Sequence, residues 1–189
     1  MNIPSRKECF RLIKQMKMMD HIIDHSVMVS NVSIFLCTAL QKKCPHLNLK
    51  LAASAGLLHD ITKTRSFTTQ ENHSLTGGQM LAKMGYPEVG DIVRQHVLLD
   101  HYEAAAPVSV EEIVNYSDKR VLHDRIVSLN RRLTYIQEKY GKCEKFKSRI
   151  RFMQVRTQDL EDKLFSFMEI TPADLSRSVT EHMEEQDHA

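Results

Sequence analysis

Hydrophobic residues recur every three or four positions along most of the chain, the spacing that places them on one face of an α-helix. Residues 61–72 break this pattern because they are polar and rich in threonine, so we expect an exposed loop there. No stretch shows the strict alternation of a strand, and the predicted fold class is therefore all-α. Helices are expected over 5–18, 20–43, 48–58, 72–84, 87–98, 109–139 and 144–168, followed by a short last helix from Thr171.

The ends of these segments carry residues that favour helix boundaries. Four of the segments open on a residue type whose side chain caps helix N-termini: Asp20, Asn48, Asn72 and Ser109. Gly141 is the expected stop of the helix over 109–139, since glycine commonly ends helices. The tail from about residue 184 is expected to be frayed.

The composition is that of a globular protein, with 42% hydrophobic and 26% charged residues among 189. No run approaches the roughly 18 apolar residues of a membrane helix, and the charged start of the chain lacks the apolar core of a signal peptide. We therefore expect a cytoplasmic protein with no membrane association. Cys9 and Cys37 lie on apolar faces and belong to no CxxC pair, so buried thiols are expected.

The charges are unevenly distributed along the sequence. Residues 119–156 contain 12 Lys and Arg against 3 Asp and Glu, whereas residues 157–189 contain 2 against 9. Such blocks are typical of solvated helix faces that complement each other, although a basic block also suits an anionic partner. Nucleic acid is not the expected partner, and the helical appendage makes a homodimer the candidate assembly.

Several polar residues lie on the apolar faces of the predicted helices. An unpaired carboxylate buried there would cost several kcal/mol or be forced to take up a proton. Any one of the histidines could be a core residue whose ring nitrogens form hydrogen bonds within the protein. A shared divalent cation explains the whole set at once. The residues concerned are His25, His59, His96 and Asp118.

His59 and Asp60 stand side by side at the end of the segment AGLLHDITK. Adjacent residues on a helix point about 100° apart and cannot easily serve one point. At a helix C-terminus the backbone unwinds, and the negative end of the helix dipole favours a cation. The pair is therefore interpreted as part of the same metal site.

The order of these residues resembles the signature of the HD-domain superfamily of metal-dependent phosphohydrolases. The resemblance spans roughly residues 5–123 and implies an HD-domain helical bundle with extra C-terminal helices. It divides the chain into a metal-binding core at 1–123 and a C-terminal helical extension at 124–189 packed on that core. Three motifs carry it: His25-Ser26-Val27-Met28-Val29, the segment AGLLHDITK, and Asn115-Tyr116-Ser117-Asp118-Lys119.

The resemblance also implies which residues bind metal. His73 and His96 fit the additional histidines of the two-metal branch, ordered H…HD…H…H…D. One cation would be held by His25, His59, Asp60 and Asp118, and a second by His73 and His96, with Asp60 bridging. The ligand types suit Mn²⁺, Fe²⁺, Co²⁺ or Ni²⁺, with Mg²⁺ also compatible.

Two positions depart from the family pattern. Thr62 stands where a glycine is frequent, and His96 is followed by Val97 where many relatives have a second histidine. His101, five residues further on, remains open as a replacement ligand, a substrate contact or a surface residue.

The implied function is hydrolysis of a phosphate ester or anhydride, in a nucleotide or related small phosphorylated molecule. Asp60 is expected to orient the attacking water as well as to bind metal. Lys63 is the candidate catalytic and substrate-binding cation, and Arg65 and His101 are further candidates for substrate binding. Two alternatives stay open: a di-iron oxygenase of the same fold, and a metal-binding regulatory or interaction module.

Overall fold

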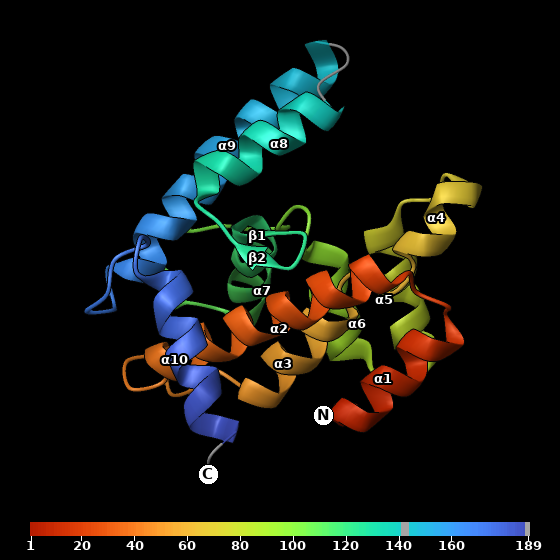
Figure 1. Ribbon diagram of the computed structural model, residues 1–189, viewed down its shortest axis with the longest axis horizontal. Coiled ribbons are helices and arrows are strands. Elements are labelled where there is room, and N and C mark those ends of the chain that lie inside the picture. The colour runs from red at the N-terminus through yellow and green to blue at the C-terminus, as the bar shows by residue number, and fades with distance from the viewer. Residues whose placement is uncertain (141–143, 188–189) are drawn as a thin grey trace.

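A computed structural model of the protein describes residues 1–140 and 144–187 and confirms the all-α fold class (Figure 1). The only strands among these residues form one short hairpin. The elements are α1 (Arg6–Gln15), α2 (Asp20–Leu40), α3 (Leu49–Leu58), α4 (Lys63–Thr69), α5 (His73–Lys83), α6 (Pro87–Gln95), α7 (Val110–Arg120), β1 (Val121–Leu122), β2 (Arg125–Ile126), α8 (Leu129–Tyr140), α9 (Glu144–Phe165) and α10 (Leu175–Asp187).

The helices α2, α3 and α7 form the centre of the molecule and pack against one another. Gly56 allows α3 to approach α2 closely, because a Cβ atom at this position would lie 2.8 Å from the Cα atom of Ser30. Such a separation is too short for any other residue. This close approach brings the C-terminal end of α3 beside the N-terminal half of α2, where His25 lies.

A second close crossing joins α5 and α6. A Cβ atom on Gly78 would lie 2.5 Å from the carbonyl oxygen of Gly90. A Cβ atom on Gly90 would likewise lie 2.5 Å from the carbonyl oxygen of Gly78. The two backbones therefore touch directly, which only glycine permits. The crossing fixes His73, the first residue of α5, relative to His96, which follows α6.

Two predicted segments are wrong. The expected loop over 61–72 contains α4, whose threonines are modest helix formers. A tertiary contact stabilises it, since the hydroxyl of Thr64 accepts a 3.0 Å hydrogen bond from the backbone N–H of Met19. The expected helix over 109–139 is interrupted after Arg120 by the β1–β2 hairpin, whose turn residue His123 has a φ of 56°.

Most predicted helix caps are confirmed, with smaller corrections. The side chains of Asn48, Asn72 and Ser109 accept hydrogen bonds from the first turns of α3, α5 and α7. Asp20 is not a cap but lies inside the first turn of α2. The tail predicted to be frayed from residue 184 is helical through Asp187. The predicted stop at Gly141 lies outside the described residues.

The C-terminal helices contact the core through buried polar residues. On α9, Glu161 accepts a 2.9 Å hydrogen bond from Arg120 and a 2.5 Å hydrogen bond from the hydroxyl of Tyr116. Lys163 lies 2.7 Å from the carboxylate of Glu112. In Figure 1, α8 and α9 run side by side and project from the body. The division of the chain at residues 123 and 124 stays a prediction.

Helix α2 is long and apolar enough, by length and composition alone, to cross a membrane. Half of its most apolar window is buried within the fold. Its buried residues, including Val29, Leu36 and Cys37, belong to the hydrophobic core, and the buried thiols predicted at Cys9 and Cys37 are confirmed. A core helix explains this composition.

Candidate metal centre

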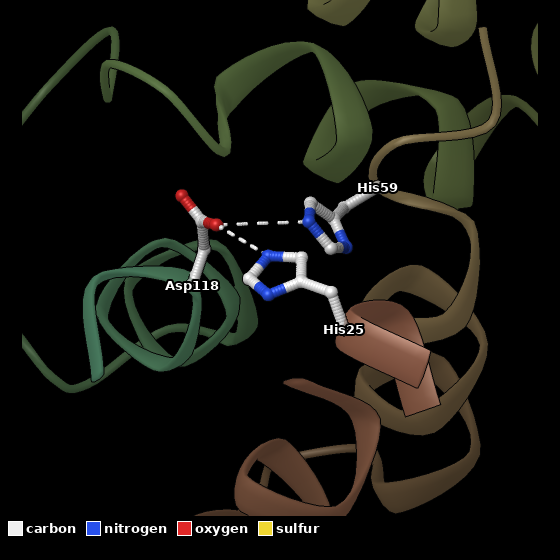
Figure 2. A group of neighbouring side chains, drawn as sticks. All are labelled: His25, His59 and Asp118. Carbon is white, nitrogen blue, oxygen red and sulfur yellow. Dashed lines mark hydrogen bonds and ion pairs between the residues drawn. The ribbon is translucent and has the colours of Figure 1, made fainter. Parts of the chain in front are cut away.

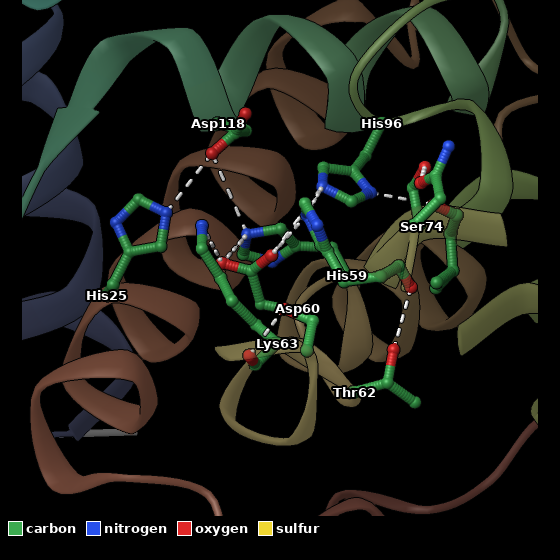
Figure 3. A network of polar contacts seen from close by, with 12 residues as sticks. His25, His59, Asp60, Thr62, Lys63, Ser74, His96 and Asp118 are labelled. Atoms are coloured by element: carbon green, nitrogen blue, oxygen red, sulfur yellow. Dashed lines mark hydrogen bonds and ion pairs between the residues drawn. The ribbon is translucent and has the colours of Figure 1, made fainter. Parts of the chain in front are cut away.

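The six residues implied as metal ligands meet at one place in the fold, and Figure 3 labels five of them. Their side chains come from α2, from the turn after α3, from the start of α5, from the end of α6 and from α7. Five of the six residues are at most 8% exposed, and the side chain of His73 is 24% exposed. The set is His25, His59, Asp60, His73, His96 and Asp118.

Asp118 joins two of the histidines (Figure 2). Its Oδ1 atom lies 3.1 Å from Nε2 of His25 and 3.7 Å from Nε2 of His59. The two imidazole rings are 5.2 Å apart, centroid to centroid. One ligand atom from each of these three buried residues lies within 4.8 Å of the others, which suits a single cation.

Three of the imidazoles are fixed by the same kind of hydrogen bond. In His25, the Nδ1 atom lies 2.9 Å from the carbonyl oxygen of His123. In His59 the same atom lies 2.8 Å from the carbonyl oxygen of Gly56, and in His96 it lies 2.7 Å from that of Val93. A carbonyl oxygen can only accept, so each Nδ1 carries the proton. In the neutral ring Nε2 then presents a lone pair to the centre, as second-shell hydrogen bonds do for metal-binding histidines.

Asp60 lies between the two halves of the site. Its Oδ2 atom lies 3.4 Å from Nε2 of His59, while Oδ1 lies 3.2 Å from Nε2 of His73 and 3.6 Å from Nε2 of His96. The Nε2 atoms of His73 and His96 are themselves 3.3 Å apart. One carboxylate thus faces both proposed cation positions, which is the arrangement required of a bridging ligand.

Two buried atoms at the centre have no hydrogen-bond partner, namely Nε2 of His59 and Oδ1 of Asp60. An unpartnered polar atom in a protein interior is costly and needs an explanation. Divalent cations would bind these atoms, Nε2 of His59 at one position and Oδ1 of Asp60 at the other, and would separate lone pairs that now face each other. The donor set of imidazole nitrogens and carboxylate oxygens therefore fits a metal of the Mn²⁺ to Zn²⁺ series.

Electrostatics within the cluster depend on burial and on the two carboxylates. Burial lowers the pKa of His25, and it lowers the pKa of His96 well below its usual range with help from His59. For His59, burial acts to lower the pKa, but the carboxylates of Asp60 and Asp118 outweigh it and raise the pKa. The rings of His25 and His96 are therefore neutral at pH 7, the state that binds metal.

Both carboxylates are held ionised. Burial alone would raise the pKa of Asp60 and Asp118, but neighbouring cations outweigh it and leave both pKa values well below the usual range. The largest opposing contributions come from Lys63 at Asp60 and from Lys119 at Asp118. Ionised carboxylates in a buried cluster favour the binding of a further positive charge.

Thr62, which replaces a frequent glycine of the family pattern, has a structural role. Its hydroxyl donates a 2.7 Å hydrogen bond to the carbonyl oxygen of His73 and lies 3.1 Å from the hydroxyl of Thr76. The side chain is fully buried. Thr62 therefore ties the turn after His59 and Asp60 to the start of α5, where His73 lies.

A cavity of about 490 Å³ opens onto the cluster. Lys63 lines it with a side chain that is 27% exposed, and its Nζ atom lies 2.8 Å from Oδ2 of Asp60. Arg132 on α8 also lines it, with a guanidinium nitrogen 3.6 Å from Oδ1 of Asp118. Lys119 lines the same cavity and donates to the carbonyl oxygen of His96. The opening is thus lined by cations close to the proposed metal positions.

Sequence reasoning missed Arg132, because it lies beyond the family motifs in a segment predicted to be part of one continuous helix. The β1–β2 hairpin reverses the chain, so that α8 returns over the cluster. The excess of basic residues after Lys119 was the available signal, but it does not identify the residue that faces the site.

The other two predicted substrate contacts lie elsewhere. Arg65 on α4 forms an ion pair with Glu71, with 2.6 Å between Nε and Oε1. His101 is exposed in the segment between α6 and α7. Neither is among the residues that line the cavity. Their roles in substrate binding, like the metal-binding and catalytic roles of the other residues, stay predictions.

Several known proteins are similar to parts of this chain. An uncharacterized protein of Methanocaldococcus jannaschii is 23% identical over 136 residues, which cover 65% of this chain and 79% of that protein. Ribonuclease Y from Rubrobacter xylanophilus and from Syntrophotalea carbinolica are 29% and 33% identical over 94 and 90 residues. Each match covers about half of this chain, 50% and 48%, but only 16% of the ribonuclease.

A crystal structure of a predicted HD superfamily hydrolase from an uncultured Thermotogales bacterium is also similar. It is 20% identical, with a TM-score of 0.48, and the alignment covers 87% of this chain and 91% of that one. The family model of the HD domain matches residues 22–129, which is more than half of the chain and includes all six residues of the cluster. The chain therefore belongs to the HD-domain family.

Proposed function

We propose that this protein is a metal-dependent phosphohydrolase that acts on a phosphate ester or anhydride of a nucleotide or a related small molecule. The observation that carries the proposal is the orphaned pair of buried atoms, Nε2 of His59 and Oδ1 of Asp60, at the centre of four histidines and two carboxylates. When bound there, divalent cations would supply an acidified water and positive charge for phosphoryl oxygens.

The protein's own residues would hold the reacting groups. His25, His59, Asp60 and Asp118 would hold one cation, and His73 and His96 would hold a second with Asp60 shared. The carboxylate of Asp60 would also accept a hydrogen bond from the attacking water and fix its direction. Fixed ligands of this kind position the reacting groups and need little reorganisation during the reaction.

Lys63 would bind the phosphoryl group of the substrate. Burial acts to lower the pKa of this lysine, but the nearby carboxylates of Asp60 and Asp118 outweigh it and raise the pKa, so the side chain is charged. Its Nζ atom is on the cavity side of Asp60, where a phosphate oxygen can replace part of its present ion pair. Arg132 would contribute a second cation from α8.

The cationic lining favours an anionic substrate over molecular oxygen. Lys63, Lys119 and Arg132 lie around the cavity, and each would stabilise a phosphate more than a neutral molecule. The di-iron oxygenase and the regulatory module remain the competing functions. Two of the similar proteins are named ribonuclease Y, so the substrate test should include RNA.

A metal-supplemented substrate screen tests the proposal. The purified protein is loaded with Mn²⁺, Fe²⁺, Co²⁺, Ni²⁺ or Mg²⁺, and metal content is measured before phosphomonoesters, nucleotides, dinucleoside polyphosphates and RNA oligonucleotides are added. We expect metal-dependent phosphate release or bond cleavage that is lost in Asp60→Ala. Iron-dependent oxygen consumption with no cleavage of any phosphate compound would instead support the oxygenase.

A further inference from the structure

A second cavity adjoins the metal-binding cavity and is lined by different chemistry. It has a volume of about 270 Å³ and shares two lining residues with the larger cavity, Val97 and Met153. Val97 directly follows His96, so the second cavity begins next to the metal cluster. Its other walls include the apolar or aromatic side chains of Leu98, Tyr102 and Phe152.

Several features of this cavity are unusual for the surface of a folded protein. Leu98 and Phe152 are 50% and 51% exposed, although both are large and hydrophobic. The hydroxyl of Tyr102 is buried and has no hydrogen-bond partner. Exposed apolar walls beside an unpartnered polar group are typical of a binding site for a molecule with both properties.

A flat cationic group lies against the aromatic walls. The guanidinium carbon of Arg156 lies 5.4 Å from the ring centre of Phe152 and 5.7 Å from that of Tyr102. Arginine and aromatic faces of this kind stack on heterocyclic bases, and the stacking does not depend on which base is present.

We infer that this second cavity binds the heterocyclic base of a nucleotide whose phosphate lies at the metal cluster. The inference rests on the proposed function, because that function places a phosphate beside Lys63. The two cavities adjoin at Val97 and Met153, which line both of them, so the base and the phosphate of one nucleotide would occupy neighbouring cavities. A polar cavity lined by cations on one side and an apolar, aromatic cavity on the other match the two ends of a nucleotide.

The C-terminal extension supplies five of the eleven residues that line this base-binding cavity. Phe152, Met153 and Arg156 lie on α9, outside the HD-domain match at residues 22–129, whereas Leu98 and Tyr102 lie inside it. The helix α9 is held against the core by the contacts of Glu161 and Lys163 described above. The extension would therefore determine which phosphorylated molecule this member of the family selects.

Equilibrium binding to the manganese-loaded protein tests the inference. AMP and ribose 5-phosphate share a sugar and a phosphate, but only AMP has a base. Calorimetry should give AMP the higher affinity, by on the order of ten-fold, from base stacking. Phe152→Ala and Arg156→Ala should remove most of this preference and leave the affinity for ribose 5-phosphate unchanged.

Val155→Ala is the matched control. Val155 is on the same helix and is 62% exposed, but it does not line the cavity. This variant should retain the full preference for AMP. Equal affinity for AMP and ribose 5-phosphate, including no measurable affinity for either, would overturn the inference. So would a Phe152→Ala variant that changes the oligomeric state and leaves the ligand preference intact.

Hydrolysis assays with the same two compounds separate this inference from the proposed hydrolysis. Base-dependent binding of AMP without hydrolysis of any phosphate compound would support the base-binding cavity and remove the proposed activity. Equally efficient hydrolysis of AMP and ribose 5-phosphate, read as equal kcat/KM values, would retain the activity and overturn the base-binding cavity.

Discussion

The Nε2 atom of His25 lies 3.1 Å from Oδ1 of Asp118, although the two residues are 93 positions apart in the sequence. The other ring nitrogen of His25 donates to the carbonyl oxygen of His123, so a neutral ring presents a lone pair to the carboxylate. Burial lowers the pKa of this histidine, which makes the neutral ring the expected state at pH 7. His25 and Asp118 would both serve as ligands of a bound cation, which would relieve this repulsive contact.

The first prediction concerns metal content. His25→Ala and Asp118→Ala should each lower the amount of Mn²⁺ bound per chain, because they remove ligands from the proposed first position. The measurement is elemental analysis of the protein after dialysis. His21→Ala is the control, since His21 is also on α2 and lines the cavity but is exposed and absent from the ligand cluster. Equal metal content in all three variants would contradict the assignment.

The second prediction concerns the number of metal ions. A variant with both His73→Ala and His96→Ala should lose one of two ions per chain, because Asp60 alone cannot hold the second cation. The helical content should persist in circular dichroism, which excludes unfolding as the cause. A wild-type protein with one ion per chain, unchanged in the double variant, would show that the site is mononuclear.

The third prediction concerns Lys63. Lys63→Ala should lower kcat/KM for a phosphate substrate by roughly 10- to 100-fold, since one charge-assisted contact with the phosphate is lost. Metal content should remain close to that of the wild type. Lys63→Arg keeps the charge and should recover part of the activity. An alanine variant with full activity would remove Lys63 from substrate binding.

The fourth prediction concerns Arg132, the cation that the sequence motifs did not identify. Arg132→Ala should raise KM more than it lowers kcat, because the guanidinium approaches the cavity from α8 and not from the ligand cluster itself. Arg131→Ala is the control, because the neighbouring side chain is exposed and does not line the cavity. The same KM for both variants would exclude a specific role for Arg132.

The fifth prediction concerns stability. Glu161→Ala should lower the free energy of unfolding by about 3–5 kcal/mol, because it leaves Arg120 buried without its partner carboxylate. Urea denaturation followed by circular dichroism measures the change. Glu181→Ala on α10 removes an exposed partner of Arg177 and should change stability by less than about 1 kcal/mol. Equal effects would show that the buried pair does not hold α9 against the core.

The ligand cluster could be predicted from the sequence because its residues lie on strongly periodic helices or directly at their ends. His25 and Asp118 are at helical spacing from core residues, and His59 and Asp60 end an apolar helix. The local sequence next to the cluster is less informative about secondary structure. The polar sequence of α4 does not show the contact between Thr64 and Met19 that stabilises the helix.

The break after Arg120 was missed for a related reason. The sequence continues with helical periodicity through residue 139, and no glycine or proline marks the turn at His123. A non-glycine residue with a φ of 56° is held there by its surroundings, including the hydrogen bond from His25 to its carbonyl oxygen. Tertiary contacts of this kind, and the cavities they form under α8 and α9, cannot be derived from local sequence.

Metal binding in the cluster is measured most directly by an anomalous difference map from crystals of the protein grown with Mn²⁺. We expect one peak within about 2.3 Å of ligand atoms from His25, His59, Asp60 and Asp118, and a second beside His73 and His96, with Asp60 contacting both. A map with no peak inside the cluster, from crystals that contain Mn²⁺ at saturating concentration, would contradict this expectation.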